Sequence, residues 1–332
     1  MNVMVKRQYL RVALFCFLSF MLTTAHTQTT HGQGKSSQDP AITSADVLAR
    51  VEVLRDELEL LRRELGVPPP AHIDISVRDA EPRETYFHAY TLSDKAHRLA
   101  LQFTGRPEKA LGILLTTKTT PVDIYAVVSE ALESIRTVKR ALYVEEVRKE
   151  GTSDPATTSS DVLRGIIHAN RELNELLSTE YSSLDTYEQV ATSINFATRL
   201  LEQFPGSTPT PDTPPFERRK TPADVLHRLV DLFEAIREVA LASGESALQL
   251  KLRSVSSTSI TPSDAYDIAR MVFAELAYFY SLLTDPRSVD EPTYPPHRLL
   301  PSHVYQQLGV LEAQLTQLTA FAKKNPGWLR NR

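Results

Sequence analysis

Two pairs of an acid and a histidine come nearest to a chemical site in this sequence. Glu84 precedes His88 by four positions, and Asp94 precedes His97 by three. A dimetal bundle needs carboxylate and imidazole ligands that point inward from four helices. Both pairs fall in one segment, and Asp94 and His97 fall beside its expected buried face. We therefore expect solvated side chains here, and we predict no catalytic residue, metal site or cofactor.

Other chemistries lack their motifs. The sequence contains no nucleophile elbow, phosphate-binding loop, dinucleotide fingerprint, His-Glu-x-x-His motif or cluster of Cys and His. Its formal net charge is -4, and its basic residues are not clustered. Both features argue against nucleic-acid binding, which depends on a concentrated positive surface.

A tyrosine recurs at one equivalent position of several segments, and it provides the candidate ligand or packing residues Tyr86, Tyr125, Tyr187, Tyr266 and Tyr305. A ring of tyrosines could line a ligand pocket. In the remaining copies the position holds leucine, at Leu48, Leu163 and Leu226. Exchange with leucine favours a packing role in which the hydroxyl reaches water or a neighbouring backbone.

These positions are equivalent because a short signature recurs eight times along the chain. Its central residue is acidic in seven copies and His in one: Asp46, Glu84, Asp123, Asp161, Asp185, Asp224, Asp264 and His303. Successive central residues are 38 to 40 positions apart, except for one interval of 24 between Asp161 and Asp185. The series predicts two blocks of four units, as an internal duplication would produce.

Each signature copy has the composition of a helix start. Six copies carry Ser or Thr at the N-cap position, five carry Pro next, and the acid completes a capping box. An anion site at each helix start is the alternative, but the acidic residue would repel an anion. Residues five, twelve and fifteen positions after the central residue are apolar in all eight copies, which is the heptad seam of bundled helices.

The sequence thus predicts an all-α fold with eight helices of about 22 residues each. We expect two tandem four-helix bundle-like blocks joined by long, Pro-rich connectors. Two connectors contain runs that could be strands, at residues 72–77 and 247–252. The connectors are long enough to run back along a helix, so parallel helices are possible and helix direction stays open. The segment from Met271 to Leu283 is apolar around most of its circumference, so it should be central or face a partner or ligand.

The first residues are typical of a secretory signal peptide. Lys6, Arg7 and Arg11 form a basic start, and the apolar stretch at 12–22 ends in small and polar residues near Ala25. That stretch is too short to span the hydrocarbon core of a bilayer. Cleavage would also remove the single cysteine and so exclude disulfides. The expected segments are a signal peptide at 1–25, a flexible leader at 26–41, and helical blocks at 42–180 and 181–332.

These features predict a non-enzymatic, exported protein of the periplasm that acts as a scaffold or interaction module. A periplasmic bundle that binds or senses an apolar small molecule is the alternative, and a metal-binding helical-bundle enzyme is a third hypothesis. Full secretion and attachment through an uncleaved signal anchor are the alternative localisations. The expected partner is another envelope protein or an apolar small molecule, with no nucleic acid and no stable membrane span after cleavage.

Overall fold

A computed structural model describes residues 42–71, 73–107, 119–146, 151, 154–254, 260–284 and 298–329. All of these belong to one compact unit. The predicted signal peptide (1–25) and leader (26–41) lie outside the described residues.

Helices make up most of the described chain, which confirms the predicted mostly helical fold. They are α2 (Ser44–Glu64), α3 (Pro82–Thr104), α4 (Pro121–Ala141), α5 (Ser159–Leu176), α6 (Ser183–Leu201), α7 (Pro222–Ser243), α8 (Pro262–Ser281) and α9 (Pro301–Lys324). Two strands, β1 (Asp74–Arg78) and β2 (Gln249–Ser254), lie in the connectors before α3 and α8. Both segments that we considered as possible strands therefore contain one.

Each of these eight helices begins at a copy of the recurring signature. In seven of them the N–H of the N-cap residue donates to the side chain three residues later, over 2.7 to 3.0 Å. In α3, Glu81 donates in the same way to Glu84. His303 accepts through Nδ1, so an imidazole takes the role of the acid at the start of α9. The signature is thus a helix-capping device.

The predicted seam forms the core. Every residue five, twelve or fifteen positions after the central signature residue is buried in all eight helices. These side chains belong to two hydrophobic clusters, one mainly from α2–α5 and the other mainly from α6–α9. The second cluster also takes in Ile75 and Val77 of β1 and Ile167 of α5, and the first takes in Tyr266 of α8. Apolar side chains therefore cross between the two groups of helices.

Helices α2–α5, which we call the first set, contact one another in a fixed pattern. Both α2 and α3 pack against α4 and α5. Arg55 bonds to Glu172, and these residues lie nine and eleven positions after the central signature residues of α2 and α5. Ser93 donates to Glu130, at nine and seven positions in α3 and α4. Arg50 bonds to Tyr125 near the starts of α2 and α4, and Glu57 bonds to Lys139 further along both, so these helices run in the same direction. Thr85 donates to the carbonyl of Ser159 at the starts of α3 and α5, and Gln102 near the end of α3 accepts the N–H of Ser178 just after α5, so these two helices are parallel as well.

Helices α6–α9, the second set, repeat this pattern. Both α6 and α7 pack against α8 and α9. Gln314 of α9 donates to Thr198 of α6, eleven and thirteen positions after the central signature residues. Gln314 also donates to the carbonyl of Pro209 in the long α6–α7 connector. Parallel neighbours explain the length of such connectors, because each must return along a whole helix before the next helix begins.

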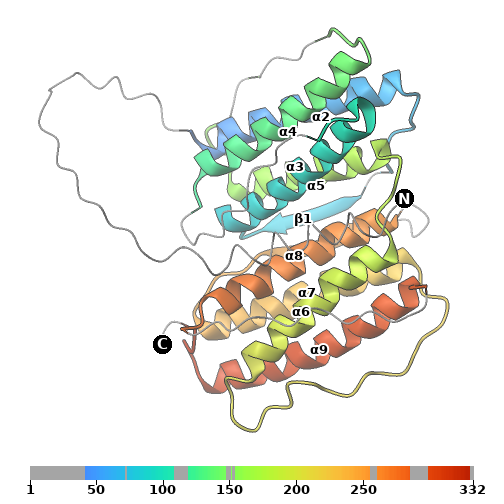
Figure 1. Ribbon diagram of the computed structural model, residues 1–332. Coiled ribbons are helices and arrows are strands. Elements are labelled where there is room, and N and C mark those ends of the chain that lie inside the picture. The colour runs from blue at the N-terminus through green and yellow to red at the C-terminus, as the bar shows by residue number, and fades with distance from the viewer. Residues whose placement is uncertain are drawn as a thin grey trace, which may run out of the picture. The chain divides into compact units, whose positions relative to one another are not determined.

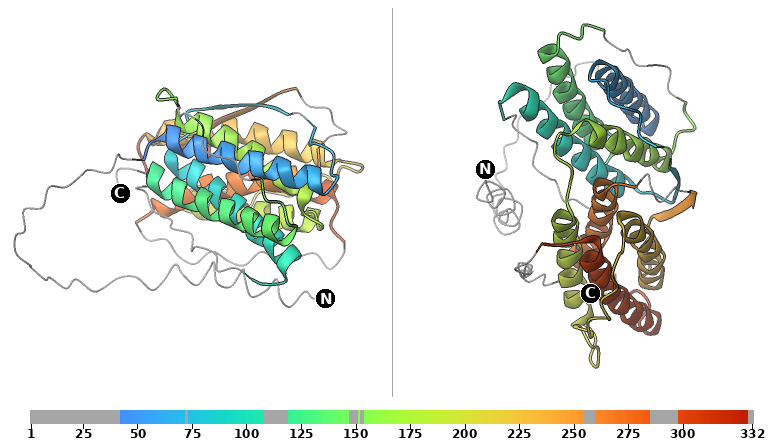
Figure 2. Two further views of the ribbon diagram at one scale, coloured as in Figure 1. Left: turned by 90° about the horizontal axis from the view of Figure 1, so that it is seen from above. Right: turned by 90° about the vertical axis from the view of Figure 1, so that its right-hand side faces the viewer.

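The two sets run in opposite directions. The junction at 177–182 is short, and it reverses the chain between α5 and α6. Across the sets, Phe87 of α3 packs on Phe273 of α8, while Lys95 further along α3 meets Asp267 nearer the start of α8. Helices α3 and α8 are therefore antiparallel. Figure 1 labels the helices of both sets, and Figure 2 shows the first set in blue to green and the second in yellow-green to red.

A two-stranded sheet joins the sets. Strand β1 pairs antiparallel with β2, with Ile75 opposite Leu252 and Val77 opposite Leu250. Each strand runs back along its own set, so the opposite directions of the sets make the strands antiparallel. Helix α8 contacts α3 and α5 as well as α6 and α7. The most uniformly apolar helix is therefore central, as its sequence predicted.

Candidate functional site

A groove of about 400 Å³ lies between β1 and α5. One wall consists of the six consecutive residues Ile73–Arg78, and the other is formed by Arg164 and His168 of α5. Within the described residues, β1 has a strand partner on one edge only. A strand edge without a partner offers a row of backbone donors and acceptors. Arg164 and His168 lie one helical turn apart, so both side chains can face the groove.

Near the start of α8, the contact between the two sets is polar. Lys95 of α3, which is fully buried, donates to Oδ1 of Asp267. Asn174 of α5 donates to Oδ2 of the same carboxylate over 3.0 Å. Burial lowers the pKa of Lys95, and the adjacent Asp267 carboxylate opposes that shift. Three helices thus place a buried ion pair with an amide partner between the sets.

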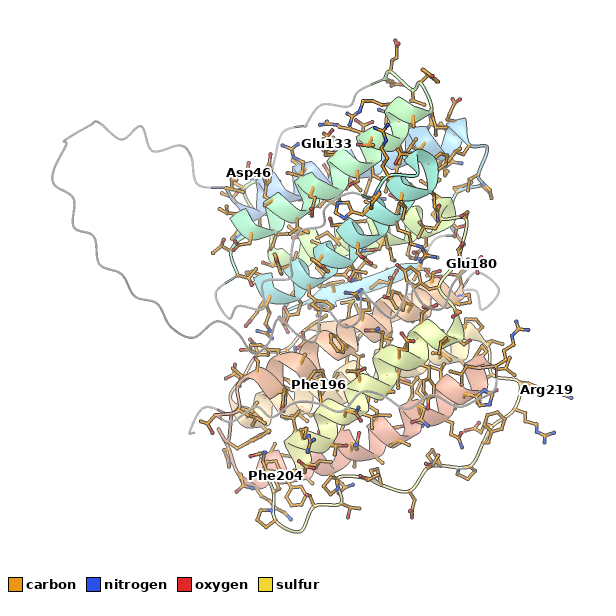
Figure 3. The ribbon with its side chains drawn as sticks, in the orientation of Figure 1. Asp46, Glu133, Glu180, Phe196, Phe204 and Arg219 are labelled. Carbon is orange, nitrogen blue, oxygen red and sulfur yellow. The ribbon has the colours of Figure 1, made fainter. Side chains whose placement is uncertain are left out.

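Asp264 performs two tasks at the same place. Its Oδ2 accepts the N–H of Thr261 and caps α8, while its Oδ1 accepts Nε of Arg171 over 2.8 Å. Arg171 also donates to the carbonyl of Ala71, before β1. Asp46, in the same position of α2, is half-buried and accepts the N–H of Thr43 at its own helix start (Figure 3). Asp264 therefore caps α8 and also connects the two sets through Arg171.

The start of α3 carries a second buried ionic cluster. Glu84 and Glu275 are both buried, and Arg83 lies 2.7 Å from Oε1 of Glu84 and 3.7 Å from Oε2 of Glu275. The guanidinium of Arg83 stacks on the Tyr278 ring at 4.1 Å. It also donates to the carbonyl of Ser246 over 2.9 Å. Because α3 and α8 are antiparallel, this cluster and the Lys95–Asp267 cluster occupy opposite ends of one helix pair.

His88 lies between these clusters along α3, and two tyrosines lie beside the Lys95–Asp267 cluster. His88 is buried, and among the described residues neither ring nitrogen has a hydrogen-bond partner. Burial lowers its pKa to about 3, helped by the positive charges of Lys95 and Arg270. Tyr181 of the short junction stacks on Tyr266 with ring centroids 3.9 Å apart, and Arg270 donates to the Tyr266 hydroxyl. The junction between the sets is therefore anchored in the same polar layer.

The five tyrosines of the recurring position lie in different surroundings. Tyr125 faces Arg50 of α2, and Tyr305 lies between Lys220 and Arg228 with centroid distances of 4.1 and 4.4 Å. Tyr266 belongs to the polar layer described above. Tyr86 and Tyr187 are buried in separate hydrophobic clusters. Three of the five rings thus face a cation, a contact that the exchange with leucine did not reveal.

The four side chains of the acid–histidine pairs differ in exposure. Asp94 is exposed as predicted, but the His97 side chain is only 11% exposed and lies 3.6 Å from Oε1 of Glu130 on α4. The expectation of solvated side chains is wrong for Glu84 and His88, which are both buried. Both side chains face α8 across the contact between the two sets. The heptad seam describes packing within one block of four helices, so it could not predict burial by a helix of the other block.

One sequence signal for the buried charges was missed. The residue eleven positions after the central signature residue is polar in six helices, at Glu57, Lys95, Ser134, Glu172, Glu275 and Gln314. All of these except Glu172 are buried. The position directly precedes the seam residue at twelve, so a polar side chain there is drawn into the core. A buried pair between Glu57 and Lys139 inside the first set has the same origin.

Among the described residues, no three His, Cys, Asp or Glu side chains are grouped so that they could hold a metal ion. No helix in the part of the chain that the structure describes is both long and apolar enough to cross a membrane. A scan against protein-family models, a search of curated proteins and a search of solved structures each found no match to this chain.

Proposed function

We propose that this chain is an exported, periplasmic interaction module without enzymatic activity, which binds an extended segment of another envelope protein. The groove beside β1 is the observation that carries this proposal. Two tandem four-helix blocks, derived from an internal duplication, would form its framework. The matching contact patterns of α2–α5 and α6–α9 support that origin.

The chemistry of the groove favours an extended polypeptide. Ile73–Arg78 line it along their whole length, and an extended chain matches the spacing of a strand's backbone groups. Addition of a strand to an open sheet edge is an established mode of peptide recognition. A third strand beside β1 would enlarge the sheet that already joins the two sets.

The opposite wall of the groove favours an acidic residue in the bound segment. The Arg164 side chain is 44% exposed and contacts Asp161, the capping acid of α5. Asp161 also accepts the N–H of Thr158, so its carboxylate serves two partners. A carboxylate from the bound segment would give Arg164 a second, charge-assisted partner. His168, one turn further along α5, would contact the same segment.

Selection from a library of random decapeptides on the purified mature protein tests this proposal. We expect enrichment of extended sequences with alternating apolar residues and at least one acid. Arg164→Glu should weaken their binding by about tenfold or more, because a charge-assisted hydrogen bond becomes a repulsion. Arg140→Glu is the matched control, because Arg140 also pairs with an acid on an exposed helix face.

Three other results would contradict the proposal. The first is no enrichment, or enriched peptides that bind the Arg164→Glu and Arg140→Glu proteins equally. The second is a large thermal shift with one class of apolar small molecule, which would favour a receptor, or bound stoichiometric metal, which would favour an enzyme. The third is an intact Met1 in a membrane fraction, where we expect a soluble protein that begins near His26 after osmotic release.

A further inference from the structure

The ionic cluster at the start of α3 has more negative than positive groups. Glu81, Glu84 and Glu275 surround the single guanidinium of Arg83. Glu81 is 41% exposed and also accepts the hydroxyl of Ser246, so water stabilises its charge. Glu84 and Glu275 are 5% and 2% exposed, so water cannot stabilise theirs. Two buried carboxylates beside one shared cation cannot both be ionised at low cost.

We propose that Glu84 and Glu275 share one proton at neutral pH, and that loss of this proton separates the two helix sets at the adjacent end of the β1–β2 sheet. The two carboxyl groups share one cation, because Nη2 of Arg83 lies 2.7 Å from Oε1 of Glu84 and 3.7 Å from Oε2 of Glu275. Oε1 of Glu84 and Oε2 of Glu275 are buried, and each faces Arg83 without a hydrogen-bond donor in good geometry among the described residues. A proton between the carboxyl groups would supply the missing donor.

The charged and titratable groups around the pair agree with this assignment. Burial and the neighbouring Glu275 raise the pKa of Glu84 well above its ordinary value, against the opposing charge of Arg83. Burial also raises the pKa of Glu275. His88, one turn along α3, has its pKa lowered to about 3 and adds no positive charge at neutral pH.

Among the described residues, the other charged groups near the pair add no unpaired cation to it. On α8, the Tyr278 hydroxyl donates to Glu245, which brings a further carboxylate towards this end. On α7, Arg237 bonds to Asp79 over 2.8 Å. The proton is therefore the group that balances the second buried carboxylate.

The Glu84–Glu275 pair lies near one end of the β1–β2 sheet, so a change in its protonation would affect that end. Glu84 is six residues beyond Arg78, the last residue of β1, and Arg78 pairs with Gln249 at the start of β2. Ser246, three residues before β2, bonds to Glu81 and Arg83 of the cluster. Repulsion between the ionised Glu84 of α3 and Glu275 of α8 would therefore separate the strands at the Arg78–Gln249 end of the sheet.

Two readouts on the full mature chain test the proposal. Infrared spectroscopy should detect a protonated carboxyl group at neutral pH that disappears in Glu275→Gln. Spin labels at Glu52→Cys of α2 and Glu234→Cys of α7, both exposed positions, should report a larger distance as the pH rises. The ratio of open to closed protein should rise by up to about tenfold per pH unit between the ordinary carboxyl pKa, which the pair regains when the sets separate, and its raised pKa in the closed protein, because opening releases one proton in this range.

Glu84→Gln and Glu275→Gln should each abolish the pH dependence, and Gln at position 84 still completes the capping box of α3. Glu57→Gln is the matched control, because Glu57 is equally buried at the same position of α2 but pairs with Lys139. Its infrared band and its distance change should match those of the unmodified protein. No carboxyl band at neutral pH, a pH-independent distance, or the same loss in Glu57→Gln would overturn the proposal.

Discussion

Lys95 of α3 and Asp267 of α8 form an ion pair inside the contact between the two helix sets, 172 positions apart in the sequence. The side chain of Lys95 is 0% exposed and that of Asp267 is 6% exposed. Asn174 satisfies the second carboxylate oxygen. Such a pair restricts how the sets can meet, because a shifted register would leave a buried charge without a partner.

Removal of one partner of this pair should therefore be strongly destabilising. Asp267→Asn leaves the Lys95 ammonium buried, and we expect a loss of about 3–5 kcal/mol in the free energy of unfolding, measured by urea denaturation. Replacement of both residues, Lys95→Met with Asp267→Leu, should restore most of that loss. Glu133→Gln, in the exposed Arg140–Glu133 pair (Glu133 is labelled in Figure 3), should change stability by less than about 1 kcal/mol. Equal effects at the buried and the exposed pair would contradict this account.

The capping acids should divide into two classes. Asp46→Ala removes only a helix cap, so we expect a cost of about 0.5–2 kcal/mol. Asp264→Ala removes the cap of α8 and also leaves Arg171 without its carboxylate, so its cost should be at least twice as large. Thermal or urea unfolding of the two variants gives the comparison. Similar losses would mean that Asp264 does not bridge the sets.

His88 should make the protein sensitive to acid. Its pKa is lowered to about 3 in the folded chain, against an ordinary value of 6.5. The unfolded chain therefore binds a proton below pH 6.5 that the folded chain does not bind until about pH 3, and stability falls as the pH falls between these values. The loss should approach about 1.4 kcal/mol per pH unit. The unfolding free energies of the unmodified protein and of a His88→Gln variant should be compared at each pH. Their difference gives the contribution of His88 alone, because Glu84 and Glu275, whose effect is opposite, are present in both proteins. A constant difference would show that His88 is accessible to protons.

Much of the fold could be predicted because it rests on local rules. A capping box needs residues three positions apart, and the seam needs only heptad spacing, so helix starts and buried faces could both be identified from the sequence. Asp46 and Leu58 illustrate the two patterns. Helix direction could not be predicted, because a connector of about fifteen residues can either span one helix or loop at its end.

The candidate site was harder to predict because it depends on contacts between the sets. The segment 72–77 was recognised as a possible strand, but its pairing with β2 depends on how the two sets are oriented. Glu84 was expected to be solvated, and Lys95 was not assigned a position. Their partners Glu275 and Asp267 lie in α8, outside the first block. The polar residues at position eleven were a usable signal, but only the antiparallel α3–α8 contact brings Lys95 and Glu275 to their opposite charges, Asp267 and Arg83.

The first set should fold when expressed alone. Its seam residues are buried among α2–α5, and its contact with the second set combines charged side chains such as Lys95 and Arg171 with a few apolar ones, so a fragment of residues 42–180 would expose a mixed polar and apolar face. We expect a helical monomer with a cooperative melting transition, observed by circular dichroism and gel filtration. An aggregated or molten fragment would mean that both sets depend on one common core, through β1 residues such as Ile75 and Val77.

Hydrogen exchange at β1 tests most directly whether this protein binds an extended segment beside that strand. Backbone amide exchange of residues 73–78 should be followed by mass spectrometry or NMR, with and without a peptide selected on the mature protein. Alternate amides of β1 should become protected on binding, while amides of β2 on the opposite side of the sheet should keep their exchange rates. Bound peptide with unchanged exchange at residues 73–78 would contradict it, because the peptide would then occupy another surface.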